Sequence, residues 1–263
     1  MALKIPSITL SRKAKIILGA LIVLLLAGGI VFLSLYSSKA LFTENPRFIL
    51  KNIVVKSSGW WSGKEYYVMQ KLDLKKGSTV LFSLDLEQLR KKLEEESSIR
   101  NVVVARRLPD TLMISITERI PRAVLHNQKS SRLIDSECIV MQKEKCLNIS
   151  ESLPVILGFR DDVPAFGKKF SVLQPAMELV MHAATDFPEL QILQINAKAE
   201  DYLVFSMYYK NIKTVVYRVW IPVNNMNLHL NALISAMPDV IVGRAGKKIV
   251  DIDLRYAGKV TLK

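Results

Sequence analysis

One stretch of the sequence limits most strongly what the chain can fold into. Between Lys15 and Lys39 lie 23 uncharged residues, IILGALIVLLLAGGIVFLSLYSS. Because about 20 apolar residues cross a bilayer as a single helix, residues 16–38 are predicted to form a transmembrane helix. A cleaved signal peptide has a shorter apolar region of about 7–15 residues and a small-residue cleavage site. The length therefore favours an uncleaved anchor, preceded by a short tail, residues 1–15.

The charges around this segment predict its orientation. Four cations precede it and one follows it closely: Lys4, Arg12, Lys13 and Lys15 before, Lys39 after. Because positive flanks stay in the cytoplasm, the tail is expected to be cytoplasmic and the chain from about residue 39 onward extracytoplasmic. No other stretch is long enough and free enough of charge to cross again. We expect a single-pass protein of the plasma membrane.

The rest of the chain remains basic. The whole chain has 37 Lys and Arg against 24 Asp and Glu, a net charge of +13. Five of these cations and no acid fall within the first 40 residues, which leaves 32 against 24, or +8, for the exported part. A basic surface can meet nucleic acid, anionic lipid or an acidic polymer. Export excludes cytosolic nucleic acid, and contact with lipid or peptidoglycan stays open.

The exported part begins with signals for one strand and two helices. Residues 48–56, FILKNIVVK, are rich in β-branched side chains and predict a strand. Residues 64–72 predict a short helix. Asp85 predicts the start of a second helix, because Gln88 follows three residues later, as in a capping box.

A β-hairpin is predicted next. Residues 102–105 form an apolar run, and residues 108–111, LPDT, carry the Pro and Asp of a turn. Leu112, Ile114 and Ile116 then alternate with other side chains, which is the period of a strand with one buried face. The order is β-α-α-β-β, in which two helices would cover one face of a three-stranded sheet.

This order resembles a POTRA domain. The resemblance rests on FILKNIVVK, on GSTVLFSLD before the second helix, and on IRNVVVARRLPDTLMISITERIPRAVL. The last segment is the most specific, because POTRA domains often close with a strand, an Arg-x-x-Pro-x-Thr-Leu turn, and a strand ending near Glu. The matching residues are Arg106, Pro109, Thr111, Leu112 and Glu118.

The segments that follow resemble the FtsQ/DivIB cell-division family. ERIPRA at residues 118–123 is similar to its E-x-x-P-x-A junction, and LPVILG at 153–158 to its L-P-x-L-x-G segment. IVDIDLRY at 249–256 is similar to its closing V-D-L-R-Y strand. Two departures stand out: Cys138 replaces a usual hairpin Gly, and VWIP at 219–222 replaces the L-G-R signature.

The second half is predicted to be rich in strands. The fold class expected for the whole chain is α+β: one N-terminal transmembrane helix, a β-α-α-β-β POTRA domain over residues 47–119, and a mixed β-rich domain over 120–263 with two helices packed on a sheet. The expected elements of this last domain are a helix at 172–186, strands at 190–196, 202–208 and 213–221, a helix at 226–237 that stops before Pro238, a strand at 249–256, and a final segment at 259–263 after Gly258.

No catalytic, metal or cofactor site is predicted. The three histidines, His126, His182 and His229, lack metal-ligand spacing, and the last two fall within expected helices. Asp251 and Asp253 alternate with apolar residues, so one face of a strand explains them. No small-molecule substrate is expected, and the chain is not expected to be an enzyme.

The two cysteines leave an alternative open. Cys138 and Cys146 lie in the exported part, where a disulfide is permitted. Their spacing could staple a hairpin, but two free thiols fit the sequence equally well, and neither a metal site nor a redox motif is present.

The family resemblance implies where partners bind. In this family the final strands and the preceding helix dock the small division proteins FtsB and FtsL. Carried onto this sequence, the partner-binding residues are Arg255, Tyr256, Val260, Thr261 and Leu262. An exposed sheet edge offers backbone groups that a partner strand can pair with. The other interpretation is that these residues only complete the sheet.

The resemblance implies a non-enzymatic scaffold of the bacterial divisome, in the inner membrane at the division site. One alternative is a POTRA-bearing adaptor of a secretion or envelope-assembly system. A second is an anchored enzyme that uses Cys138, and a third is a eukaryotic type II glycoprotein with a sequon at residues 148–150.

Overall fold

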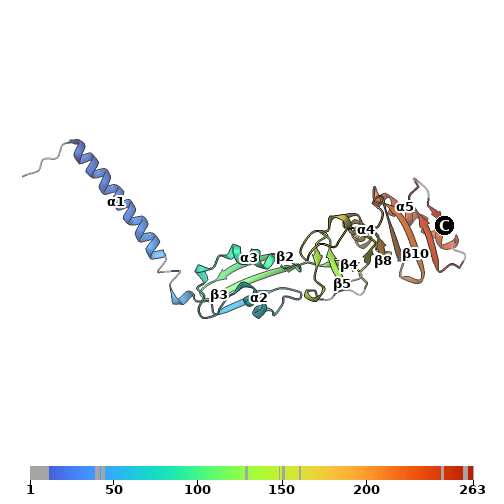
Figure 1. Cartoon of the computed structure of the whole chain (residues 1–263), viewed down its shortest axis with the longest axis horizontal. Coiled ribbons are helices and arrows are strands. Elements are labelled where there is room, and N and C mark those ends of the chain that lie inside the picture. The colour runs from blue at the N-terminus through green and yellow to red at the C-terminus, as the bar shows by residue number, and fades with distance from the viewer. Residues whose placement is uncertain are drawn as a thin grey trace, which may run out of the picture.

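The computed structural model describes residues 12–38, 42, 45–127, 130–147, 149, 152–159, 161–243, 246–256 and 260–262. Helix α1, Arg12–Ser38, is followed by two units with separate cores, and the molecule is elongated (Figure 1). The predicted features at Lys4, Lys39, Gly258 and most of the sequon lie outside the described residues.

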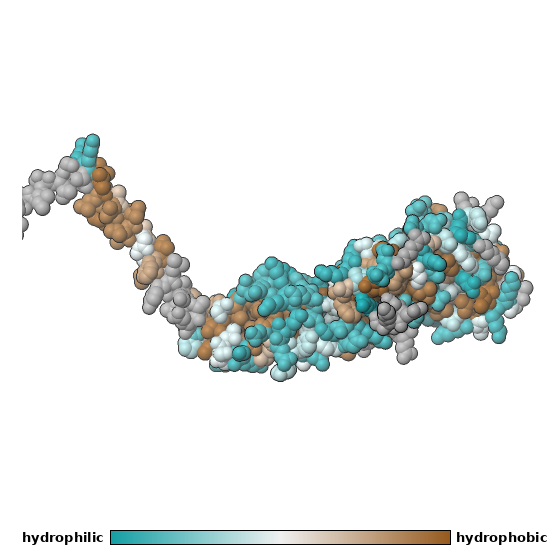
Figure 2. Space-filling view, viewed as in Figure 1, coloured by the Kyte–Doolittle hydropathy of each residue, from teal (hydrophilic) through white to brown (hydrophobic). Residues whose placement is uncertain are grey.

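Helix α1 is apolar around its circumference. Its window Ile16–Leu33 has a mean hydropathy of 3.0, and none of that window is buried against the rest of the protein. Within the part of the chain that the structure describes, it is the one helix long and apolar enough to cross a membrane. Figure 2 shows its hydrophobic surface as a brown rod beside the largely teal units. A helix that is hydrophobic all round needs an apolar surrounding.

The first unit has the predicted β-α-α-β-β order. Its elements are η2 (Pro46–Phe48), β1 (Asn52–Lys56), α2 (Glu65–Leu72), η3 (Leu81–Ser83), α3 (Leu86–Glu94), β2 (Ile99–Arg107) and β3 (Thr111–Glu118). The sheet order is β1-β3-β2, with β1 parallel and β2 antiparallel to β3. One face of the sheet packs on the two helices, and this core includes Trp61, Leu93 and Ile114.

Helix α3 begins where its cap predicts. The Asp85 carboxylate accepts hydrogen bonds from the backbone N–H of Glu87 at 3.0 Å and of Gln88 at 3.1 Å, which satisfies two of the unpaired donors of the first turn. Leu89 and Leu93 are buried on the face turned to the sheet.

The hairpin is confirmed and is longer than predicted. Strand β2 runs from Ile99 to Arg107, beyond the apolar run at 102–105. Leu112, Ile114 and Ile116 are buried, as their alternation predicts. The extension includes Arg106, whose Nε and Nη2 donate to the carbonyls of Leu81 at 2.8 Å and Leu84 at 2.6 Å and so tie the strand to η3.

Glu118 at the end of β3 holds the loop after β1. Its carboxylate accepts from the backbone N–H groups of Trp60 and Trp61, both at 2.9 Å, and from the hydroxyl of Ser57. A side chain at Gly59 would collide with this carboxylate. The loop therefore needs a small residue beside Glu118.

The second unit is built on one nine-stranded sheet. The strand order is β12-β11-β10-β9-β8-β7-β4-β5-β6. The strands are β4 (Pro121–Asn127), β5 (Ser130–Asp135), β6 (Val140–Met141), β7 (Val155–Leu157), β8 (Leu190–Asn196), β9 (Tyr202–Tyr209), β10 (Ile212–Pro222), β11 (Ile249–Asp253) and β12 (Thr261–Leu262). The remaining elements are η4 (Lys143–Lys145), η5 (Ser171–Leu173), α4 (Gln174–Thr185) and α5 (Met226–Gly243).

Both long helices of this unit pack on the sheet, as predicted. Residues of α4 such as Leu179 and of α5 such as Leu233 belong to the same buried cluster as Phe205 and Val219 of the sheet. Because β9 buries every second residue, the helices cover one face of the sheet.

The predicted end of the last helix was wrong. Helix α5 continues through Pro238 and ends at Gly243 instead of stopping at residue 237. Proline removes one backbone N–H and so one intrahelical hydrogen bond. Two apolar residues after it, Val240 and Ile241, pack on the core of the unit, and we attribute the continuation of the helix to that burial.

The closing strand is also shorter than predicted. Strand β11 ends at Asp253, whereas the pattern predicted a strand to residue 256. The N–H of Leu254 still donates to the carbonyl of Trp220 at 2.9 Å. The N–H of Arg255 instead donates to the side chain of Asp253 at 3.1 Å, so the chain leaves the sheet there.

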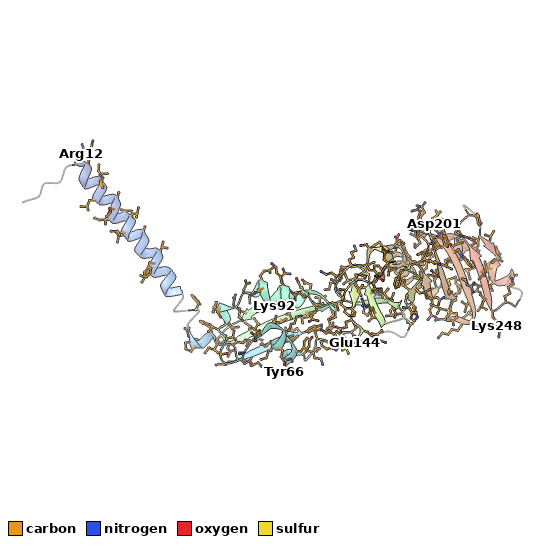
Figure 3. All side chains as sticks on the ribbon, in the orientation of Figure 1. Arg12, Tyr66, Lys92, Glu144, Asp201 and Lys248 are labelled. Atoms are coloured by element: carbon orange, nitrogen blue, oxygen red, sulfur yellow. The ribbon has the colours of Figure 1, made fainter. Side chains whose placement is uncertain are left out.

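Ion pairs join the two units. Lys145 Nζ lies 2.5 Å from Glu96 Oε2, and Lys71 Nζ lies 2.7 Å from Glu96 Oε1. Arg119 Nη1 lies 2.6 Å from Asp135 Oδ2 and 2.7 Å from Glu137 Oε2. We call these six residues the junction. Glu144, labelled in Figure 3, lies beside Lys145 in this region.

Candidate binding site at the C-terminal sheet edge

Strand β12 forms one edge of the large sheet. Its Leu262 pairs with Ile252 and its Thr261 with Asp253, both on β11, and no described strand pairs with its outer side. Both residues are exposed, and Leu262 is 48% exposed. The edge lies near the C-terminus, at the end of the molecule farthest from α1 (Figure 1). Such an edge presents backbone N–H and C=O groups for a further strand.

Arg255, a predicted partner-binding residue, is held by its own neighbours. Its Nε and Nη2 donate to the two carboxylate oxygens of Asp253 at 2.9 Å and 2.7 Å. Its guanidinium carbon lies 4.7 Å from the centre of the Tyr202 ring. The hydrogen bonds to Asp253 raise the pKa of Arg255 above its usual value. Arg255 therefore fixes the turn between β11 and the edge.

The other predicted residues differ in what they contact. Tyr256 is 58% exposed. Val260 is partly buried and packs on the core of the unit, so at this position completion of the core is the better interpretation. The hydroxyl of Thr261 donates to the carbonyl of Asp253 at 3.1 Å, which ties the edge to β11. Tyr256, Thr261 and Leu262 are accessible to a partner.

Two exposed apolar residues beside this edge were missed by the sequence analysis. Val242 at the end of α5 is 86% exposed, and Ile249 at the start of β11 is also exposed. The end of α5 reaches the edge, because a side chain at Gly243 would lie 3.7 Å from Leu262. Val242 was missed because the helix was expected to end at Pro238. Figure 3 shows Lys248, which precedes β11, on the opposite rim of this unit from Asp201.

The residues considered for catalysis do not assemble into a site. The ring of His182 lies between Asp186, at 2.6 Å from Nδ1, and Glu178, at 3.7 Å from Nε2, on the surface of α4. Among the residues that the structure describes, no group of three or more His, Cys, Asp or Glu could hold a metal ion. His126 is exposed on β4, and His229 is half-buried on α5.

Both cysteines are free thiols in the structure. Cys138 is buried, with its sulfur 3.7 Å from Gln174 Oε1, and burial raises its pKa. Burial, and to a lesser degree the charges of Glu118 and Glu144, raise the pKa of Cys146 to about 11. Thiols are poor nucleophiles when they stay protonated at neutral pH.

A cavity of about 580 Å³ lies between the two units, and its lining includes Glu118, Arg119, Cys146 and Leu147. Two smaller cavities, of about 200 and 250 Å³, border α4. The edge at β12 is therefore a surface site and is separate from these cavities.

Comparisons with known proteins show a family match and several similar proteins. Residues 62–119 match the family described as POTRA domain, FtsQ-type. The chain is 35% identical over 95 residues to "Cell division protein FtsQ" of Rickettsia bellii, covering 36% of this chain and 34% of the relative. It is 29% identical over 148 residues to the protein of that name in Rickettsia felis (51% and 54%), and 27% over 164 residues to that of Koribacter versatilis (61% and 45%).

An apolar N-terminal helix, a POTRA domain of the FtsQ type and a large mixed sheet define a membrane-anchored POTRA protein. The aligned regions span between about a third and just over half of the length of these relatives. The chain therefore contains an FtsQ-type POTRA domain and is similar, over part of its length, to cell division proteins named FtsQ.

Proposed function

We propose that the chain is a scaffold of the bacterial divisome that acts by binding other division proteins rather than by catalysis. The FtsQ-type POTRA domain and the similarity to cell division proteins named FtsQ support a role in cell division. The observation that carries the proposal of binding is the edge at β12, which has one strand neighbour and is bordered by the exposed residues Val242, Ile249 and Tyr256.

We infer the following arrangement in the cell. Residues 16–38 span the inner membrane, the tail before them is cytoplasmic, and the POTRA unit (47–119) and the sheet unit (120–263) are periplasmic. The cations that precede the span support this orientation. A fluorescent fusion should gather at mid-cell, whereas a uniform or polar pattern would favour the secretion or envelope-assembly alternative.

The proposed mode of binding is strand addition. An extended segment of a small membrane protein of the FtsB or FtsL kind would pair its backbone with the free side of β12, and main-chain hydrogen bonds would supply affinity. Tyr256 and Leu262 would contact its side chains, because large amphipathic rings bury much area at small entropic cost. Arg255 would serve as a positioning residue, since its guanidinium is engaged by Asp253.

Proline substitution tests this mode of binding. Leu262→Pro removes a backbone donor of the edge strand, and we expect it to reduce partner capture in pull-downs by tenfold or more. Leu262→Ala is the matched control, because it keeps the amide and removes only the side chain, and it should retain more binding than Leu262→Pro. Circular dichroism should show both variants folded. Normal capture by the folded proline variant would contradict strand addition.

A further inference from the structure

Three phenylalanines cluster at the end of the POTRA unit that follows α1. The ring of Phe82 lies 4.9 Å from that of Phe48 and 5.1 Å from that of Phe42, centre to centre. Phe42 is 44% exposed and stands four residues after Ser38, the last residue of α1. Aromatic side chains with one exposed face are typical of membrane–water interfaces.

The tip of the β2–β3 hairpin lies at this same end. Leu108 at the tip is 56% exposed. The N–H of Lys51 donates to the carbonyl of Asp110 at 2.9 Å, which places the tip beside the start of β1. The guanidinium carbon of Arg106 lies 5.5 Å from the centre of the Phe82 ring. Leu108 and Phe42 are therefore two exposed apolar groups on one end of the unit.

Cations surround these apolar groups. The loop at residues 75–79 is tied to the same end, because Leu50 N–H donates to Thr79 O at 2.8 Å and Gly77 N–H donates to Leu50 O at 2.9 Å. Six basic residues lie at this end against four acidic ones, of which Asp110 pairs with Lys51, Asp85 caps α3 and Glu87 pairs with Arg90. They are Arg47, Lys51, Lys75, Lys76, Arg106 and Arg107 against Asp73, Asp85, Glu87 and Asp110.

Chain length keeps this end close to the membrane surface. Six residues, 39–44, separate the end of α1 from Asn45. Each residue spans at most about 3.6 Å, so the end lies within roughly 25 Å of Ser38. Exposed apolar groups ringed by cations fit a surface with anionic headgroups and an apolar layer beneath them.

We propose that this end of the POTRA unit, which we call the membrane-proximal face, docks on anionic phospholipids of the bilayer that α1 enters. Phe42 and Leu108 enter the interfacial layer, while Lys75, Lys76 and Arg107 contact lipid phosphates. The contact limits the tilt of the POTRA unit on its anchor. This role is independent of the protein-binding edge at β12.

Hydrogen exchange of the full chain in lipid nanodiscs tests the proposal. Amides at residues 75–79 and 106–110 should exchange at least about fivefold more slowly in discs with phosphatidylglycerol than in discs of phosphatidylcholine alone, because one basic residue near an anionic surface contributes about that factor. The difference should shrink in high salt, since screening weakens the attraction.

Charge reversal provides the matched comparison. The triple variant K75E/K76E/R107E should lose this lipid-dependent slowing, and Leu108→Asp should reduce it. The variant K213E/K247E/K248E carries the same change in net charge on the sheet unit and should keep the slowing. Equal exchange in the two kinds of disc, or equal loss of slowing in both triple variants, would overturn the proposal.

Discussion

At the scale of the residue, Asp253 organises the candidate binding edge. Its side chain is fully buried and accepts three hydrogen bonds from Arg255, one from the backbone and two from the guanidinium. Its carbonyl accepts from Thr261 on the edge strand. The carboxylate of Asp253 therefore fixes the turn that leaves β11, and the backbone carbonyl of the same residue ties down the start of β12.

Asp253→Asn should lower the free energy of unfolding by about 1–3 kcal/mol, because it weakens hydrogen bonds to a charged group and leaves Arg255 only partly paired. Urea denaturation measures this. Asp251→Asn is the control on the same strand, since its carboxylate lies 3.7 Å from Arg218, and it should cost less than about 0.5 kcal/mol. Equal costs at the two positions would argue against the role of Asp253.

The sequence predicted this region in part. The family resemblance pointed to Arg255 and Tyr256, and the structure places both beside the edge. Nothing in the pattern indicated that Tyr202, far earlier in the chain, lies under the Arg255 guanidinium. The contact depends on the pairing of β9, β10 and β11, and local periodicity does not report such pairing.

At the scale of the element, the extension of α5 shapes the surroundings of the edge. The last turns of the helix carry Val242 beside β12. They form although Pro238 interrupts the hydrogen-bond ladder. Burial of Val240 against the sheet favours the extension, since packing of a buried helix face can outweigh local propensity.

Pro238→Ala should raise the free energy of unfolding by about 1–2 kcal/mol. The substitution restores a helical hydrogen bond and removes a residue that costs about 3 kcal/mol in a helix interior. The greater conformational freedom of the unfolded chain without proline offsets part of this gain in stability. Pro238 is exposed, so no packing is lost. Thermal and urea denaturation measure the change. A less stable variant would contradict this prediction.

Elements with strong periodicity were predicted well. Strand β8 has the predicted bounds, and β9 and β10 differ from theirs by one residue at the ends, because alternation of buried and exposed side chains is a local signal. Helix α4 carries Pro175 in its first turn, as predicted. Element ends set by tertiary contacts were mispredicted at Pro238 and Asp253. The strand predicted over residues 48–56 was also wrong at its start, because β1 begins only at Asn52 and Phe48 belongs to η2.

At the scale of the whole molecule, the junction holds the POTRA unit and the sheet unit together. Glu96 is buried between Lys71 and Lys145. Burial acts to raise the pKa of Glu96, but hydrogen bonds and charges from Lys145 and Lys71 outweigh it and lower the pKa below its usual 4.5. The ionised form of Glu96 therefore stabilises the folded chain.

The sign of this shift predicts a dependence on pH. A depressed pKa gives stability that is present above about pH 4.5 and is lost as the pH falls through the folded-state value. Glu96→Gln should lower the free energy of unfolding by about 2–3 kcal/mol at pH 7. This is somewhat less than the cost of breaking a fully buried ion pair, because both lysines are partly solvated. The stability of this variant should fall less steeply than that of the wild type as the pH is lowered below about 4.5. Parallel pH profiles would contradict the assignment.

The junction could not be predicted from the sequence. Glu96 and Lys145 are 49 residues apart, and Arg119 and Asp135 are 16 apart, and isolated charged residues give no signal of which partner they meet. Their pairing emerges only when both sheets are formed. The separate units were predictable because each has its own hydrophobic pattern.

The central claim is that a partner docks at the edge of the sheet farthest from the membrane anchor. Site-specific photo-crosslinking in dividing cells tests it most directly, with the crosslinker at Tyr256 and, as a control, at Tyr66, an exposed tyrosine on α2. We predict that position 256 captures a small single-span division protein through an extended segment and that position 66 does not capture that protein. Capture of the same protein at both positions, or of none at position 256, would contradict the account.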